Sequence, residues 1–176
     1  LTGRRVLELG CGTGLVSLVA AALGAAVVAT DIPECLAAVT APNLSANGVG
    51  GMRGAVEAKE LVWGTTPLAP FFSAAQWDLV VASDVIYRSE HVALLLETLR
   101  GVVAPGRTAL VAFDRRGREG VAAFLRAVRG DGTPAQENKA GAAATAAAAA
   151  AVAEEAGGDS STSTSSSSSS SSGSGS

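Results

Sequence analysis

The feature that most constrains this chain is a glycine-rich turn that follows a short apolar run near its beginning. The run Val6–Leu9 has the composition of a β-strand, and the residues after the turn are apolar at helical spacing as far as Gly24. A second strand-like run, Ala26–Thr30, ends on Asp31. The glycines of the turn alternate with other residues: Gly10, Gly12 and Gly14. The order of strand, glycine turn, helix, strand and acid predicts half of a nucleotide-binding βαβ unit.

Each part of this unit suits the binding of a nucleotide. Glycines allow a tight turn and let a ligand approach the backbone where a Cβ would collide. The free amides at the start of the helix favour negative charge. Asp31, at the carboxyl end of the second strand, is placed to accept hydrogen bonds from both ribose hydroxyls. A dinucleotide fingerprint needs a third glycine where Leu15 stands, so the spacing argues against a dinucleotide.

An acid, Glu8, stands two residues before the first glycine of this G-x-G-x-G turn. The stretch resembles motif I of the class I, seven-strand methyltransferases that use S-adenosyl-L-methionine. The resemblance implies that Glu8 holds the methionine ammonium group and that the glycine turn passes the methionine portion. It also implies that Asp31 binds the ribose, and we expect Ser83 to lie on the cofactor side of the site.

The rest of the chain continues the alternation of strands and helices. Further strands are expected at three places: Ala55–Ala58, Trp77–Ala82 and Thr108–Phe113, the last two buried on both faces. Helices are expected from Pro33 to Asn47, capped by Asp31 or Thr30 and with Leu36, Val39 and Leu44 on the inner face; around Val92–Leu99, closed by Gly101; and over Val121–Val128, with Phe124 and Leu125 inward. The predicted fold class is α/β, a Rossmann-like doubly wound, mostly parallel sheet with five strands.

Two later motifs narrow the resemblance within the methyltransferases. The first is LVWG at Leu61–Gly64, and the second is the D-x-x-Y of SDVIY, formed by Asp84 and Tyr87. Two further stretches match the same pattern: TDIPECL, followed by Asn43 and Asn47, and EHVALLLETL. Together with the glycine turn they are similar to the protein-lysine methyltransferase branch that includes the calmodulin and valosin-containing-protein lysine methyltransferases. The resemblance covers roughly Arg4 to Arg129. It implies that adenine packs on Trp63 and that Asp84 and Tyr87 line the channel for the methyl acceptor.

The residues alone leave several of these roles open. Trp63 suits adenine stacking and the covering of a sheet edge equally well. Asp84 could cap the next helix, and Tyr87 could pack on the sheet. His91 lacks partners at ligand spacing and is better read as a solvated residue at a helix start, so no metal site is expected. The arginines after the last strand, Arg115, Arg116 and Arg118, could meet an acidic substrate, although a solvated turn accounts for them better.

The chain departs from the family pattern at both ends. We expect residues 1–130 to form the methyltransferase core and residues 131–176 to be a disordered, low-complexity tail rich in alanine and serine. The segment before the first strand and the C-terminal antiparallel hairpin of the family are missing. We therefore expect the chain to be a fragment truncated at both ends; it begins at Leu1, and its one methionine is Met52.

Composition limits the partners. The net charge is −3 and the isoelectric point about 5.1, with no basic run, which argues against nucleic acid. The two cysteines lack the spacing of a disulfide framework or a metal site, and Cys11 is read as a small residue that fits the turn. No apolar stretch has membrane-spanning length. We expect a monomer in the cytoplasm or nucleus whose partner is a protein that presents a lysine.

The predicted function is therefore S-adenosyl-L-methionine-dependent methyl transfer to a lysine of a protein. Methyl transfer to a small molecule or a nucleic acid is the first alternative, because the glycine turn and Asp31 are common to all these enzymes. The D-x-x-Y sequence differs from the N-P-P-Y-type signature of amino-group methylation on bases. A second alternative is a truncated, catalytically inactive relic of the fold.

Overall fold

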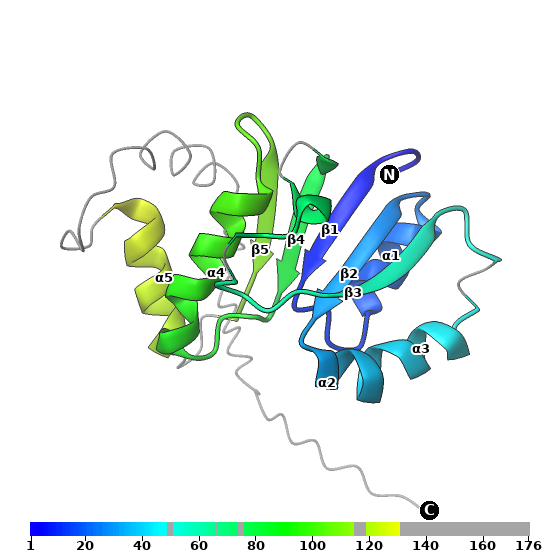
Figure 1. The fold of residues 1–176 in the computed structure, drawn as a ribbon, viewed down its shortest axis with the longest axis horizontal. Coiled ribbons are helices and arrows are strands. Elements are labelled where there is room, and N and C mark those ends of the chain that lie inside the picture. Colours follow the sequence, from blue (N-terminus) through cyan, green and yellow to red (C-terminus); the bar gives the residue numbers. More distant parts are fainter. Residues whose placement is uncertain (49–50, 66, 74–75, 115–118, 131–176) are drawn as a thin grey trace, which may run out of the picture.

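Five parallel strands form the sheet around which the described part of the chain is built (Figure 1). The computed structural model describes residues 1–48, 51–65, 67–73, 76–114 and 119–130. The strands are β1 (Arg5–Leu9), β2 (Ala26–Asp31), β3 (Ala55–Glu60), β4 (Leu79–Ser83) and β5 (Thr108–Ala112). They lie in the order β3-β2-β1-β4-β5, and all four neighbouring pairs are parallel. The predicted Rossmann-like sheet is confirmed.

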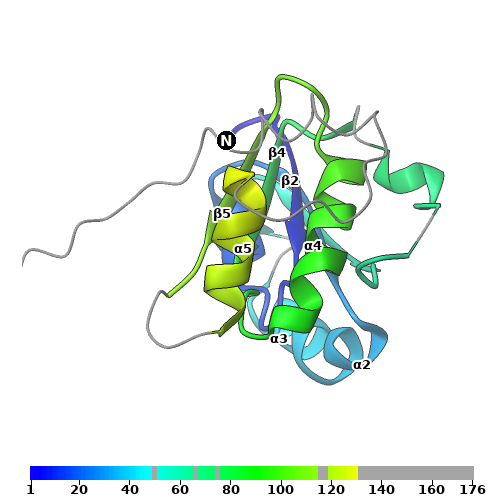
Figure 2. The same cartoon turned by 90° about the vertical axis from the view of Figure 1, so that its left-hand side faces the viewer.

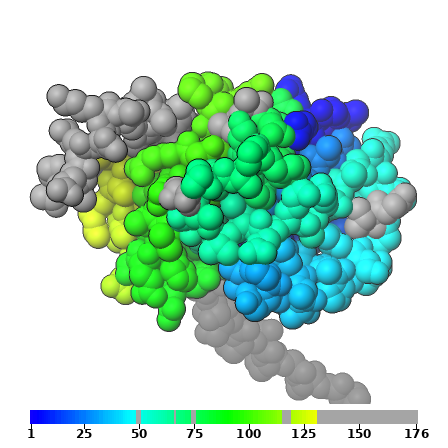
Figure 3. Space-filling view, viewed as in Figure 1, coloured from blue at the N-terminus to red at the C-terminus, as the bar shows by residue number. Residues whose placement is uncertain are grey.

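Helices cover both faces of the sheet (Figures 1 and 2). On one face lies α1 (Leu15–Ala22). The run formed by α2 (Pro33–Cys35), a π-helical turn η1 (Leu36–Thr40) and α3 (Ala41–Ala46) follows β2 and lies below the carboxyl ends of the strands in Figure 1. On the other face lie α4 (Ser89–Val102) and α5 (Glu119–Arg129), together with the segment that contains the 3-10 turn η3 (Pro70–Phe72). In Figure 3 this segment, in teal, lies across the front of the molecule beside α4. No helix in the described residues is long and apolar enough to span a membrane.

The alternation of side chains along the strands produces these two layers. In β1, Val6 packs with the small residues of α1, Ala20 and Ala21, whereas Leu7 and Leu9 face the larger core beneath α4 and α5. Successive strand residues point to opposite faces, so one apolar run supplies both cores. Glu8 lies on the α1 side of the strand, so its side chain meets Ser17 of α1.

Several expectations about the elements are wrong in detail. The helix after β2 is capped by Ile32, without a side-chain hydrogen bond, and not by Asp31 or Thr30. On its predicted inner face Val39 is exposed, and the buried residue is Thr40. The strand expected at Thr108–Phe113 is not buried on both faces, because β5 is an edge strand with Leu110 44% exposed.

Other boundaries differ by a few residues. Trp77 precedes β4 and lies in the core, 2% exposed, rather than in the strand. Helix α4 continues through Gly101 to Val102. The expected arginine cluster and the expected tail, residues 131–176, lie outside the described residues.

Candidate functional site

The candidate site is a cavity of about 710 Å³ at the carboxyl ends of the strands. The register places these ends side by side, with Leu9 opposite Thr30 and Ser83 opposite Ala112. The cavity lies where the chain leaves β1 in one direction and β4 in the other, the switch point at which open α/β sheets bind ligands. Its wall includes eight of the nine residues predicted from the sequence: Glu8, Gly10, Gly12, Asp31, Trp63, Ser83, Asp84 and Tyr87.

The glycine turn forms the floor of this cavity. All three of its glycines have positive φ, at 69°, 50° and 78°. A Cβ on Gly10 would lie 2.8 Å from Val85 Cγ1 and 3.1 Å from Trp63 Cζ2, so a side chain cannot be added there without displacing both walls. The ninth predicted residue, Gly14, lies outside the cavity wall and packs towards Leu44 of α3.

Glu8 is a buried carboxyl group at the back of the cavity. It is 2% exposed and accepts a hydrogen bond from the Ser17 hydroxyl of α1. Burial raises the pKa of the Glu8 carboxyl above its usual value, although the bond from Ser17 opposes the shift and the nearby charge of Asp31 adds to it. A cationic group in the cavity would stabilise the charged form of Glu8, because an opposite charge offsets the cost of burial.

Asp31 anchors the turn as well as facing the cavity. Its Oδ2 accepts a hydrogen bond of 2.9 Å from the Gly12 amide, and its Oδ1 accepts one of 2.8 Å from the Ile32 amide. Each carboxylate oxygen has a second lone pair, so both oxygens can still accept hydrogen bonds from a ligand. The sequence predicted the ligand role and missed the structural one.

Trp63 forms a side wall next to the turn. Its ring approaches Gly10 and packs at the edge of the core beneath α4. The ring therefore offers an aromatic surface to the cavity, and its stacking on adenine stays a prediction.

The opposite wall comes from the segment after β4. Asp84 has a φ of 58° and its amide donates to Ala112 O at 2.9 Å. It does not cap the next helix, because α4 begins at Ser89 with Arg88 as its cap residue. Tyr87 is 52% exposed and so is not packed on the sheet. Ser83 lies at the end of β4 on the same wall.

His91 lines the cavity, and its ring stands nearly perpendicular to the Tyr87 ring, with ring centroids 5.9 Å apart. The described residues contain no group of three or more His, Cys, Asp or Glu side chains able to hold a metal ion. Burial raises the pKa of the Cys11 thiol to about 12, so this buried thiol is a poor nucleophile. Cys35, at the cavity wall, also has a raised pKa, mainly through burial.

The sequence did not predict the residues whose hydroxyl groups hold the glycine turn and Glu8 in place. The Thr40 hydroxyl donates to Gly12 O at 2.6 Å, and the Thr30 hydroxyl donates to Glu8 O at 2.6 Å. Ser17 binds the Glu8 side chain. Ser17 and Thr40 lie 9 and 28 residues from their partners, and no spacing rule in the sequence connects such pairs.

Comparison with known proteins agrees with this architecture. Residues 1–131 match a family described as lysine methyltransferase. The chain is 42% identical over 99 residues to protein N-lysine methyltransferase METTL21A of Danio rerio, covering 56% of this chain and 44% of that protein. It is 36% identical over 124 residues to EEF1A lysine methyltransferase 3 of Mus musculus, covering 70% of this chain and 51% of that protein. The chain spans about half the length of these curated relatives.

Solved structures support the fold. A methyltransferase from Methanosarcina mazei, described as SAM-dependent, matches with a TM-score of 0.52 and 20% identity, covering 63% of this chain and 52% of that one. The [4+2]-cyclase SpnF matches with a TM-score of 0.56 and 19% identity, covering 74% and 51%. Since one of these proteins is a cyclase by name, the likeness establishes the fold and not the reaction.

Proposed function

The chain belongs to the lysine methyltransferase family, and from this premise we propose that it transfers a methyl group from S-adenosyl-L-methionine to a lysine side chain of a protein substrate. The observation that carries the proposal is the single cavity that joins the glycine turn, Glu8 and Asp31 to Asp84 and Tyr87. Two reactants must meet in one enclosed space for direct transfer, and this cavity has one set of polar groups for each.

The cofactor side of the cavity fits S-adenosyl-L-methionine. Glu8 offers a buried negative charge to the methionine ammonium, and Asp31 offers free lone pairs to the ribose hydroxyls. Trp63 offers an aromatic face to the adenine. When bound, the cofactor supplies a methyl group made electrophilic by its sulfonium.

The acceptor side of the cavity would favour the neutral form of a lysine amine and orient it for attack. A free lysine has a pKa of about 10.4, so it carries its proton at pH 7 and has no lone pair for attack. Apolar side chains in the cavity wall, among them Val62, Val85 and Leu94, disfavour the charged form by desolvation. Asp84 holds and orients the amine, and the face of Tyr87 attracts it while it is still cationic. We assign no dedicated general base.

The first test is ligand binding. Saturating S-adenosylhomocysteine, the product of the cofactor, should raise the melting temperature, because a ligand at a hundredfold excess over Kd stabilises the folded state by about 2.7 kcal/mol. Absence of any shift would refute the cofactor assignment. The second test is incubation of the protein with a cell extract and methyl-labelled cofactor. Label in protein, located on lysine by mass spectrometry, supports the proposal, whereas label only in metabolites or RNA contradicts it.

A further inference from the structure

The segment that carries Trp63 is tied to α4 through one buried hydroxyl group. Thr98 is 2% exposed, and its Oγ1 accepts a hydrogen bond of 3.0 Å from the Gly64 amide. The same Oγ1 donates to Leu94 O one turn earlier, at 2.9 Å. The hydroxyl is thus fixed by its own helix and holds the residue that follows Trp63.

The backbone at Gly64 fits closely against α4. Its φ is +79°, and a Cβ there would lie 2.5 Å from Leu94 Cδ2. Only glycine combines this conformation with this approach. Leu94 itself lines the ligand cavity, so the contact that receives Gly64 also belongs to the cavity wall.

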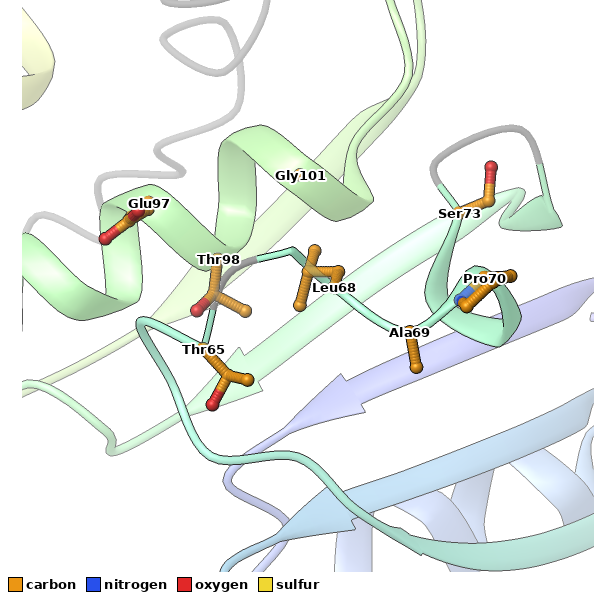
Figure 4. Close-up of a pocket in the computed structure, with 8 residues that line it drawn as sticks. All are labelled: Thr65, Leu68, Ala69, Pro70, Ser73, Glu97, Thr98 and Gly101. Atoms are coloured by element: carbon orange, nitrogen blue, oxygen red, sulfur yellow. The ribbon is translucent and has the colours of Figure 1, made fainter.

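Beyond Gly64 the segment is separated from α4 by a second hollow of about 450 Å³ (Figure 4). Figure 4 shows Thr98 and Gly101 on the helix and Thr65, Leu68, Ala69 and Pro70 on the facing segment. Leu68 returns to the helix next to Gly101. The hollow interrupts the packing between this part of the segment and α4, so the Gly64–Thr98 hydrogen bond and the Gly64–Leu94 contact are the described contacts with α4 beside Trp63.

We propose that Thr98 is a positioning residue that, through Gly64, holds the Trp63 ring at the wall of the ligand cavity. The proposal rests on the proposed function for the identity of the ligand, but the order of Trp63 itself is independent of it. Thr98 does not itself line the cavity; its hydroxyl reaches the wall through the Gly64 amide on one side and the Leu94 carbonyl oxygen on the other.

The test compares three variants. Thr98→Val keeps the shape of the side chain and removes the hydroxyl, so the Gly64 amide loses its acceptor. Thr98→Ser keeps the hydroxyl and should restore wild-type behaviour. Val102→Ala is the matched control, because it removes buried apolar atoms from the same helix at a residue that is fully buried and absent from the walls of both hollows. Each is measured without ligand by acrylamide quenching of tryptophan fluorescence and then titrated with S-adenosylhomocysteine.

The chain has two tryptophans, and Trp77 is 2% exposed, so quenching reports mainly on Trp63. We expect Thr98→Val to raise the quenching constant by at least a half and to weaken ligand binding about five- to tenfold, as expected if part of the stacking on a base is lost. Thr98→Ser and Val102→Ala should stay within about twofold of the wild-type affinity, within the range that distant changes produce.

Wild-type quenching in Thr98→Val overturns the proposal, and so does increased quenching without a loss of affinity. A matching loss in Val102→Ala also overturns it, since general destabilisation would then suffice. If the wild-type protein itself binds no S-adenosylhomocysteine, the proposed function fails, and the quenching comparison alone decides whether Thr98 orders Trp63.

Discussion

Replacement of Asp31 by alanine should damage both the fold of the turn and the binding of the cofactor. The carboxylate accepts hydrogen bonds from the Gly12 and Ile32 amides, at 2.9 and 2.8 Å. The Ile32 amide is exposed and can bind water in the variant, whereas the Gly12 amide is partly buried. A hydrogen bond to a charged group contributes about 1.5–3 kcal/mol, so Asp31→Ala should lower the free energy of unfolding by about 1.5 kcal/mol, the lower end, through Gly12 alone.

The loss of binding comes in addition to this loss of stability. Removal of the acceptor for the ribose hydroxyls should weaken S-adenosylhomocysteine binding about ten- to a hundredfold. Urea unfolding followed by circular dichroism measures the first effect; with an m-value of about 1.5 kcal/mol per molar, the midpoint should fall by about 1 M. Isothermal titration at a temperature where the variant is folded measures the second.

Asp78 provides the matched control. Its carboxylate also accepts a backbone hydrogen bond, 2.9 Å from the Arg5 amide, and pairs with Arg4 and Arg107, but at the opposite end of the strands. Asp78→Ala should lower stability and leave ligand affinity unchanged. Wild-type stability in Asp31→Ala would refute the anchoring role. Wild-type affinity in a destabilised Asp31→Ala would refute the ribose role.

Three further predictions concern the other walls of the cavity. Burial raises the pKa of Glu8, so the folded state holds this proton more tightly than the unfolded chain, and the carboxyl group costs stability increasingly as pH rises above 4.5. Glu8→Gln should therefore be more stable than wild type at pH 7, with a difference that shrinks as urea midpoints are compared down through pH 4.5, and it should bind ligand poorly. Asp84→Ala and Asp84→Gly should both bind S-adenosylhomocysteine normally and lose methyl transfer. Because the φ of residue 84 is 58°, which disfavours a residue with a Cβ, the glycine variant should be more stable than the alanine variant by about 1 kcal/mol. Gly10→Ala should lower the melting temperature and weaken binding, and addition of Val85→Ala should restore part of the affinity by removing the 2.8 Å contact.

The sequence predicted the sheet well because the signals for it are local. Apolar runs predict four of the five strands, whereas β3, which contains Glu57, Lys59 and Glu60, has only a weak strand signal. The glycine turn after β1 predicts the first crossover. The predicted burial is wrong where an apolar strand lies at the edge of the sheet. Thr108–Phe113 reads as a doubly buried strand, but β5 lies at the edge of the described sheet, and only Ala109 in it is buried. Composition alone does not distinguish a central strand from an edge strand.

The site could be predicted as far as it follows strand ends. Glu8, Asp31 and Asp84 lie at or next to the carboxyl ends of three strands, and parallel pairing brings such positions together. The residues behind them could not be predicted. Ser17, Thr40 and Thr98 are small polar residues inside helices, where they are ordinary in sequence, and their importance arises only from what the tertiary fold places opposite their hydroxyls.

The two sides of the cavity are parts of one packed unit. Strands β1 and β4 are neighbours, so the turn after β1 and the segment after β4 start from adjacent positions. Gly10 packs between Val85, the residue after Asp84, and the ring of Trp63. Helix α4 begins shortly after Tyr87, and through Thr98 it reaches back to the residue after Trp63. The wall assigned to the acceptor thus supports the ring assigned to the adenine.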